Sequence, residues 1–239
     1  MELHQFSHSA FCEKVRLILA YKGLSATLVE VSPGLGQLEL FRMSGQRQVP
    51  VLVDGGEVIA DSTAIALYLE ERHPVPALLP ADPAGRAKIL LLEDWADTTL
   101  ATGARLAFLQ AAASDPVLRS ALLPEATPSP LRRLVGALPG GVMAPVTEAL
   151  QEAITPCQAS QMRRNLEHLA AIVSTQPYLE GSQLSLVDLA VVAQLSLLKC
   201  PASWGAPLAD RGVGGIANSP VLEPLFAWRD KIVEATSKA

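Results

Sequence analysis

A proline at the head of a short strand, followed by a tight hairpin, constrains the fold of this chain more than any other feature. Proline cannot donate a backbone hydrogen bond to a sheet, so Gln48-Val49-Pro50-Val51-Leu52 predicts a strand that starts at the proline. Asp54-Gly55-Gly56 then predicts a hairpin turn. A cis Val49-Pro50 bond there would turn the backbone groups of Val49 outward, free to pair with an extended ligand.

An acidic residue and a hydroxyl follow the hairpin at the start of a predicted helix. The helix begins near Asp61-Ser62 and carries Ile65 and Leu69 on one face. Its first turn offers free backbone N–H groups, and a carboxylate and a hydroxyl beside them could hold the charged end of a ligand. Such a pair taken alone would more often serve as a helix cap. The binding interpretation therefore depends on the neighbouring Val49-Pro50.

Strand and helix patterns alternate through the first third of the chain. Strands are expected at 2–6, 27–31, 51–53 and 57–60, with helices at 11–22 and 62–72. Between the second and third strands the sequence predicts an irregular segment with one helical turn near 38–41. This order predicts a small mixed sheet with helices packed on it.

The character of the sequence changes after His73. Residues 74–83 contain four prolines and predict a semi-rigid linker, and no strand pattern follows it. A long helix is expected over about 84–112, whereas the proline-rich residues 113–161 predict short helices joined by loops. Ser185-Leu186-Val187-Asp188 predicts a capping box at the start of another helix.

Composition restricts the possible partners. The 239 residues are 49% hydrophobic and 18% charged, as in globular proteins, and the net charge of −5 argues against a nucleic-acid partner. The most apolar stretch, 184–198, contains Asp188 and Gln194 and is too short to cross a membrane. Three widely spaced cysteines predict no disulfide framework, and the four histidines lack metal-ligand spacing. We expect a cytoplasmic protein without a metal.

These motifs, in this order, resemble those of the glutathione S-transferase family over nearly the whole chain. The resemblance implies an α/β plus all-α fold, in which a thioredoxin-like N-terminal domain precedes an all-helical C-terminal domain. The implied division is a glutathione-binding domain at 1–73, a proline-rich linker at 74–83, and a helical domain at 84–239 that forms the second-substrate pocket. Glutathione as co-substrate, a small electrophile as second substrate and a homodimer are implied as well.

The resemblance assigns Ser9 as the residue that activates the thiol. Its hydroxyl would donate a hydrogen bond to the sulfur, and the start of the following helix would favour the anion. Lowering the pKa of a thiol by about two units requires roughly 2.7 kcal/mol of differential stabilisation. A plain helix-capping role for Ser9 is the simpler alternative.

The glutathione-binding positions of the family match six residues: Arg47, Gln48, Val49, Pro50, Asp61 and Ser62. Val49 would pair with the cysteinyl unit, and Pro50 matches the cis-proline. Asp61 and Ser62 would hold the γ-glutamyl end. Gln48 would contact the glycyl carboxylate, with Arg47 as a substitute cation because Ser44-Gly45-Gln46-Arg47 departs from the usual pattern there.

Several functions stay open. The first is conjugation of glutathione to small electrophiles, as in detoxification. Alternatives are a Cys12-dependent thioltransferase or dehydroascorbate-type reductase, a glutathione-dependent isomerase, and a glutathione-fold binding module without turnover. Arg105, Phe108 and Trp204 are candidates for the second-substrate pocket, although packing is the simpler role for the two aromatic residues.

A homodimer has independent support in the expected long helix. Four consecutive apolar residues, 89–92, point all around a helix, so at least one of them faces away from its own core. A neighbouring helix of the same subunit is the alternative cover for that surface. Two-fold dimers commonly bury such faces.

Overall fold

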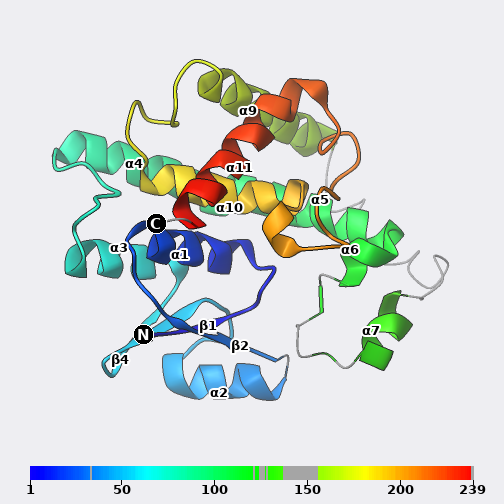
Figure 1. Ribbon diagram of the computed structural model, residues 1–239, viewed down its shortest axis with the longest axis horizontal. Helices are drawn as coiled ribbons and strands as arrows, with labels where there is room; N and C mark the ends of the chain where they lie inside the picture. The colour runs from blue at the N-terminus through cyan, green and yellow to red at the C-terminus, as the bar shows by residue number, and fades with distance from the viewer. Residues whose placement is uncertain (33, 121, 124–126, 128, 137–155, 238–239) are drawn as a thin grey trace.

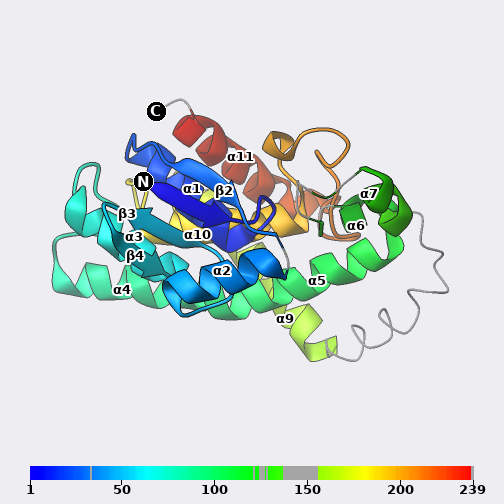
Figure 2. The same cartoon turned by 90° about the horizontal axis from the view of Figure 1, so that it is seen from below.

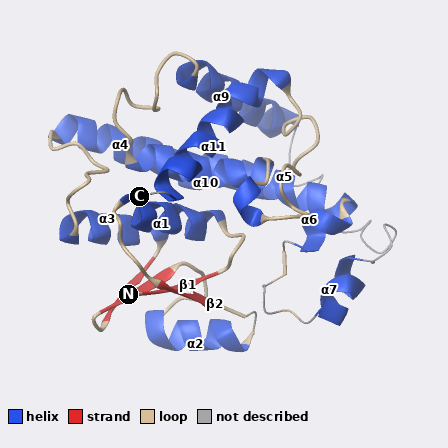
Figure 3. Cartoon of the chain, viewed as in Figure 1, coloured by secondary structure: helices blue, strands red, loops and turns tan. Residues whose placement is uncertain are grey.

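The computed structural model covers residues 1–239 and describes all of them except 33, 121, 124–126, 128, 137–155 and 238–239. The strands of the described part all lie within the first 60 residues, and helices make up most of the rest (Figure 3). The expected succession of a mixed α/β part and a helical part is therefore present.

The sheet has four strands in the order β2-β1-β3-β4. The strands are β1 (Glu2–Gln5), β2 (Thr27–Glu30), β3 (Val51–Asp54) and β4 (Glu57–Ala60). β1 is parallel to β2 and antiparallel to β3, which in turn is antiparallel to β4. Leu3 of β1 pairs with Leu28 on one side and Leu52 on the other. This topology confirms the thioredoxin-like fold.

Helices cover both faces of the sheet. α1 (Ala10–Tyr21) and α3 (Ser62–Arg72) lie on one face and α2 (Leu35–Ser44) on the other (Figure 1). The expectation of one helical turn near 38–41 is wrong, because α2 has 10 residues. Leu40 is its one buried residue, so the helix has almost no apolar periodicity to reveal it. Its ends are set by Gly34 at φ 85° and Gly45 at φ 77°.

The helical part begins with a long rod. α4 (Pro83–Trp95) and α5 (Ala101–Ser114) run end to end through a π-helical turn, η1 (Ala96–Leu100), as Figure 2 shows. The long helix expected over 84–112 is thus present, with a π turn inside it. Shorter helices α6 (Pro116–Ser120) and α7 (Ser129–Gly136) follow. Much of the predicted 113–161 segment, namely 137–155, lies outside the described residues.

The remaining helices are α9 (Pro156–Val173), α10 (Leu186–Leu198) and α11 (Glu223–Ser237). α10 is buried along its whole length and crosses the middle of the molecule beside α1 (Figure 1). The predicted capping box fixes its start, because the Ser185 amide and hydroxyl donate to Asp188 Oδ2 at 2.8 and 2.7 Å. Among the described helices, none combines the length and apolarity that a membrane span requires.

The proline-rich connection between the two parts is tied down on both sides. The buried Lys22 ammonium donates to the carbonyl groups of His73 and Pro76 at 2.6 and 2.9 Å. From the helical part, the Leu186 amide donates to the Leu78 carbonyl at 3.0 Å. These bonds hold the connection in place, while the division at 1–73, 74–83 and 84–239 stays a prediction.

Candidate functional site

A cavity of about 560 Å³ lies between the α/β part and the helical part. The loop after β1, the segment before β3, η1, α5 and α10 contribute to its wall. The lining residues are Phe6, His8, Ser9, Ala10, Phe11, Val31, Gln37, Arg47, Gln48, Val49, Asp97, Ala101, Thr102, Arg105, Phe108, Leu109, Leu122, Gln194 and Leu197. We call it the central cavity.

The central cavity brings together six of the predicted site residues: Ser9, Arg47, Gln48, Val49, Arg105 and Phe108. The other predicted residues, Cys12, Pro50, Asp61, Ser62 and Trp204, do not line it. Trp204 lies one layer behind the wall, since its ring packs on His8 with centroids 4.7 Å apart.

Ser9 combines both of the roles considered for it. It is the N-cap of α1, and its Oγ accepts a hydrogen bond from the Cys12 amide at 3.4 Å. It also lines the central cavity, so the N-terminus of α1 meets the cavity wall there. The partial positive charge of a helix N-terminus favours an anion at such a place.

Cys12 lies behind Ser9 and is fully buried. Its Sγ accepts from the Phe6 amide at 3.5 Å. Burial raises the pKa of the Cys12 thiol above its ordinary value of 9.0, and this effect outweighs the hydrogen bonds and the Arg16 charge that lower it. The environment disfavours the thiolate that a cysteine nucleophile needs.

The segment before β3 has the expected form. The Val49-Pro50 bond is cis, and β3 begins directly after Pro50, at Val51. Val49 lines the central cavity beside Gln48 and Arg47, which are both exposed. The Arg47 guanidinium lies 5.5 Å from the centroid of the Phe41 ring, within the range of a cation–π contact.

Asp61 caps α3 in a strained conformation. Its Oδ1 accepts from the amides of Thr63 and Ala64 at 2.9 and 3.0 Å. Its φ of 82° is rare for a residue other than glycine and costs on the order of 1–3 kcal/mol. Strain of this kind is concentrated at binding and active sites, so Asp61 remains a candidate for ligand binding.

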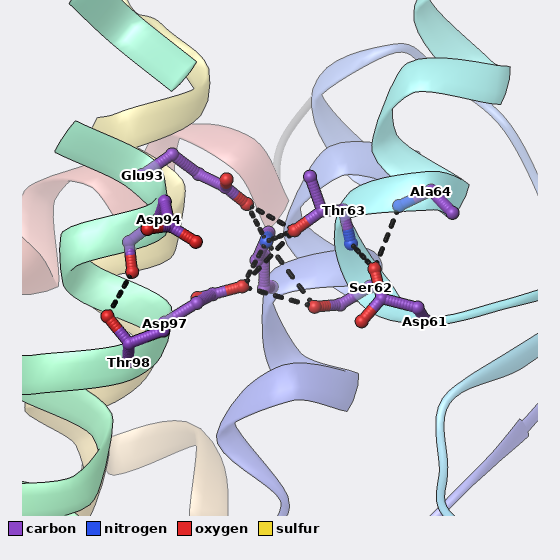
Figure 4. Close-up of polar contacts among 9 residues, drawn as sticks. Asp61, Ser62, Thr63, Ala64, Glu93, Asp94, Asp97 and Thr98 are labelled. Atoms are coloured by element: carbon purple, nitrogen blue, oxygen red, sulfur yellow. Dashed lines mark hydrogen bonds and ion pairs between the residues drawn. The ribbon is translucent and has the colours of Figure 1, made fainter. Parts of the chain in front are cut away.

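Ser62 belongs to a buried polar cluster that joins the two parts of the molecule. We define the Lys14 cluster as Lys14, Ser62, Thr63, Glu93 and Asp97. The Lys14 ammonium contacts the hydroxyls of Ser62 and Thr63 at 3.3 and 3.1 Å and pairs with both carboxylates. Figure 4 shows Glu93 and Asp97 pointing toward Ser62 and Thr63 from the neighbouring helix.

Sequence reasoning missed every member of this cluster except Ser62. Glu93 and Asp97 follow the buried Ile89 at intervals of four residues, so they share its helix face. Lys14 likewise stands between the buried Glu13 and Val15 of α1. Charged residues at buried helical positions are a signal that could have been noticed, because such residues are rarely buried unless they are paired.

The cluster is short of positive charge, with one ammonium against two carboxylates. Asp97 also lines the central cavity, and its buried Oδ1 has no hydrogen-bond partner within the described part of the chain. The cavity therefore has an acidic end at Asp97, while Arg47 and Arg105 supply positive charge elsewhere on its wall.

One face of α5 lines the central cavity. Ala101, Arg105 and Phe108 are spaced by four and three residues, with Thr102 and Leu109 beside them. Phe108 is buried, whereas Arg105 is exposed. Gln194 of α10 also lines the cavity. It is a buried polar residue that sequence reasoning did not single out for a site.

The family profile described as "Glutathione S-transferase, N-terminal domain" matches residues 3–81. A solved glutathione S-transferase from Rhodospirillum rubrum F11 has the same fold over 94% of this chain and 90% of its own, with a TM-score of 0.58 and 25% identity. Residues 3–81 therefore form a glutathione S-transferase N-terminal domain. FzlA from C. crescentus also shares the fold, with a TM-score of 0.66 and 22% identity over 99% of this chain and 90% of that one.

Curated relatives match this chain over part of its length. A stringent starvation protein A homolog from Pasteurella multocida is 34% identical over 100 residues, which is 40% of this chain and 47% of the relative. Maleylacetoacetate isomerase from Pseudomonas aeruginosa is 39% identical over 94 residues, which is 37% of this chain and 44% of the relative. The matches thus span less than half of these relatives.

Proposed function

We propose that this protein is a glutathione transferase that conjugates the thiol of glutathione to small electrophiles, with Ser9 stabilising the thiolate. The observation that carries the proposal is the position of Ser9 at the N-terminus of α1, in the wall of a cavity that Gln48 and Val49 also line. A hydroxyl and a helix N-terminus at one point of a cavity favour a bound anion.

The charges around the central cavity are consistent with glutathione as a ligand. Glutathione carries an ammonium and a carboxylate at its γ-glutamyl end and a second carboxylate at its glycyl end. We assign the γ-glutamyl end to Asp61 and Ser62, close to the acidic Asp97, and the cysteinyl unit to the backbone of Val49. The glycyl carboxylate is assigned to Arg47 and Gln48, which lie on the same cavity wall.

The chemistry required of Ser9 is modest. A thiol with a pKa of about 8.5 is only a few per cent thiolate at pH 7, and a shift of about two units makes the thiolate predominant. The Ser9 hydroxyl keeps its proton and donates it in a hydrogen bond to sulfur. One charge-assisted hydrogen bond together with the helix N-terminus supplies a stabilisation of roughly 2.7 kcal/mol.

A glutathione-dependent isomerase is the second candidate, and the similarity to maleylacetoacetate isomerase favours it. The same thiolate would add to a double bond, allow rotation and then leave. A Cys12-dependent reductase has less support, because burial raises the pKa of that thiol. A binding module without turnover would retain glutathione affinity and show no reaction with any electrophile.

The experiment has two stages. Calorimetry with glutathione tests binding, and initial rates with 1-chloro-2,4-dinitrobenzene and with a cis-enone acid test transfer and isomerisation. Ser9→Ala is compared with Ser182→Ala, which removes an exposed hydroxyl away from the cavity. We expect only Ser9→Ala to slow the reaction. Failure of the wild-type protein to bind glutathione would contradict the proposal.

A cytoplasmic location and a role in detoxification belong to the same proposal. They are supported by Cys12 and Cys200, which are both free and buried, as is usual for proteins of a reducing compartment. A homodimer with a partner seated against α3 and α4 is also proposed, from the resemblance and from the exposed Leu91 of α4. The reaction described needs no metal.

A further inference from the structure

The central cavity holds a cation that glutathione does not account for. Arg105 lies on the cavity face of α5, one turn before Phe108. Within the described part of the chain it forms no ion pair or hydrogen bond. A guanidinium left without a partner on the wall of a cavity is a ready binding group for a carboxylate, because its N–H groups match the two oxygens.

Glutathione has two carboxylates, and both already have assigned partners in the proposed function. The γ-glutamyl carboxylate belongs to Ser62 and the start of α3, and the glycyl carboxylate belongs to Arg47 and Gln48. Arg105 comes from a different wall, on α5. It is therefore available to the second substrate.

The other residues that line the cavity indicate the chemistry of the rest of that substrate. Phe11, Phe108 and Leu197 provide apolar surface around the cavity. Gln194 adds a carboxamide that is 1% exposed, and its Nε2 has no hydrogen-bond partner among the described residues. Buried polar groups in proteins are usually paired, so an acceptor oxygen of a ligand is a fitting partner for this donor. The wall thus combines apolar surface, one neutral donor and one cation.

We propose that the second substrate is a small unsaturated carboxylic acid with an apolar body, and that Arg105 binds its carboxylate. This inference rests on the proposed function for the position of the thiolate. A sulfur lone pair forms a C–S bond to the carbon β to the activating carbonyl, and the π electrons move onto that carbonyl as an enolate. Water then protonates the α-carbon, so that the net change is addition of the S–H of glutathione across the double bond.

The test compares an acid with its neutral ester. Rates of glutathione addition to trans-3-benzoylacrylic acid and to its ethyl ester are measured and corrected for the uncatalysed reaction. In the wild-type protein we expect kcat/KM for the acid to exceed that for the ester by about tenfold or more. Arg105→Gln should remove this preference by lowering only the value for the acid. Arg105→Lys should keep part of it.

The control is Arg86→Gln, which removes an exposed positive charge on α4 outside the central cavity. This variant should leave kcat/KM unchanged for both the acid and the ester. An equal loss of kcat/KM for the acid and for the ester in Arg105→Gln would overturn the proposal. So would a rise in KM for glutathione with the acid preference unchanged, because Arg105 would then serve glutathione.

A binding measurement separates failure of this inference from failure of the proposed function. The saturated 3-benzoylpropionic acid cannot react with the thiol, and its binding is followed by calorimetry against that of its ethyl ester. If the protein turns over neither enone, tighter binding of the acid that Arg105→Gln abolishes still supports the anion site. Equal binding of acid and ester overturns it.

Discussion

Lys14 of α1 and Asp97 of the π-helical turn form a buried ion pair, with 2.6 Å between Nζ and Oδ2. The Lys14 side chain is 0% exposed, and Glu93 pairs with the same ammonium. A buried charge is tolerated only when it is paired and hydrogen-bonded. The pair therefore fastens the α/β part to the helical part beside the central cavity.

Removing the ammonium should be costly for the fold. Lys14→Met leaves two carboxylates in a buried site, and we expect the free energy of unfolding to fall by about 3–5 kcal/mol. Urea unfolding followed by circular dichroism measures the change. The control is Lys88→Met, which breaks the surface pair with Glu180 and should cost at most about 1 kcal/mol. Equal losses in the two variants would show that the buried pair adds nothing specific.

Asp61 should matter for glutathione binding beyond its role as a cap. We expect Asp61→Ala to weaken binding by one to two orders of magnitude, on the order of 1.5–3 kcal/mol for a lost charge-assisted contact. Asp82→Ala is a matched control, because Asp82 caps α4 in the same way through the Gly85 amide. Calorimetry with glutathione should show unchanged affinity for that control. Unchanged affinity in folded Asp61→Ala would remove Asp61 from the site.

Substitution of Ser9 should impair conjugation more than substitution of Cys12. Ser9→Ala removes the hydroxyl that we propose to donate to sulfur, so the pH at which half of the bound glutathione is thiolate should rise by up to about two units. Titration of thiolate absorbance in the ultraviolet measures this pH. Cys12→Ala should have a mild effect on the rate of conjugation. The reverse ranking would favour the thioltransferase, in which case Ser9→Cys should gain disulfide-exchange activity.

Cys12 and Cys200 should resist alkylation in the folded protein. Burial raises the pKa of Cys12 and raises that of Cys200 to about 12. At pH 8 both thiols are therefore protonated and inaccessible, and iodoacetamide should modify them only after denaturation. Peptide mass spectrometry reports each site separately. Rapid labelling of native Cys12 would show that it is a reactive thiol.

Leu91 should be part of a dimer interface. It is 70% exposed on α4, whereas Ile89 two residues earlier is buried. We expect light scattering at micromolar concentration to show a dimer, and Leu91→Glu to yield a monomer. Leu35→Glu is the control, since Leu35 is 79% exposed on α2, on the other side of the sheet. A mass near the 25.3 kDa of one chain for the wild-type protein would refute the dimer.

The sequence by itself determined the features that local chemistry controls. The proline before β3, the Gly55-Gly56 hairpin and the Ser185–Asp188 capping box were readable because each depends on a few neighbouring residues. The order of these motifs was enough to predict a small mixed sheet and a helical part, and the family resemblance implied the thioredoxin-like form of the sheet. Helix α2 was misjudged because it buries one residue and leaves no apolar period.

Tertiary structure alone decided which distant residues meet. Arg105 and Ser9 face one cavity although they are 96 positions apart in the sequence, and no local pattern connects α5 to the start of α1. The Lys14 cluster assembles side chains from α1, α3 and the α4–η1 rod. Packing takes these charges out of water at a cost, and only the partners that the fold brings together offset that cost. Local propensity shapes each element, whereas burial and pairing of charges depend on the whole fold.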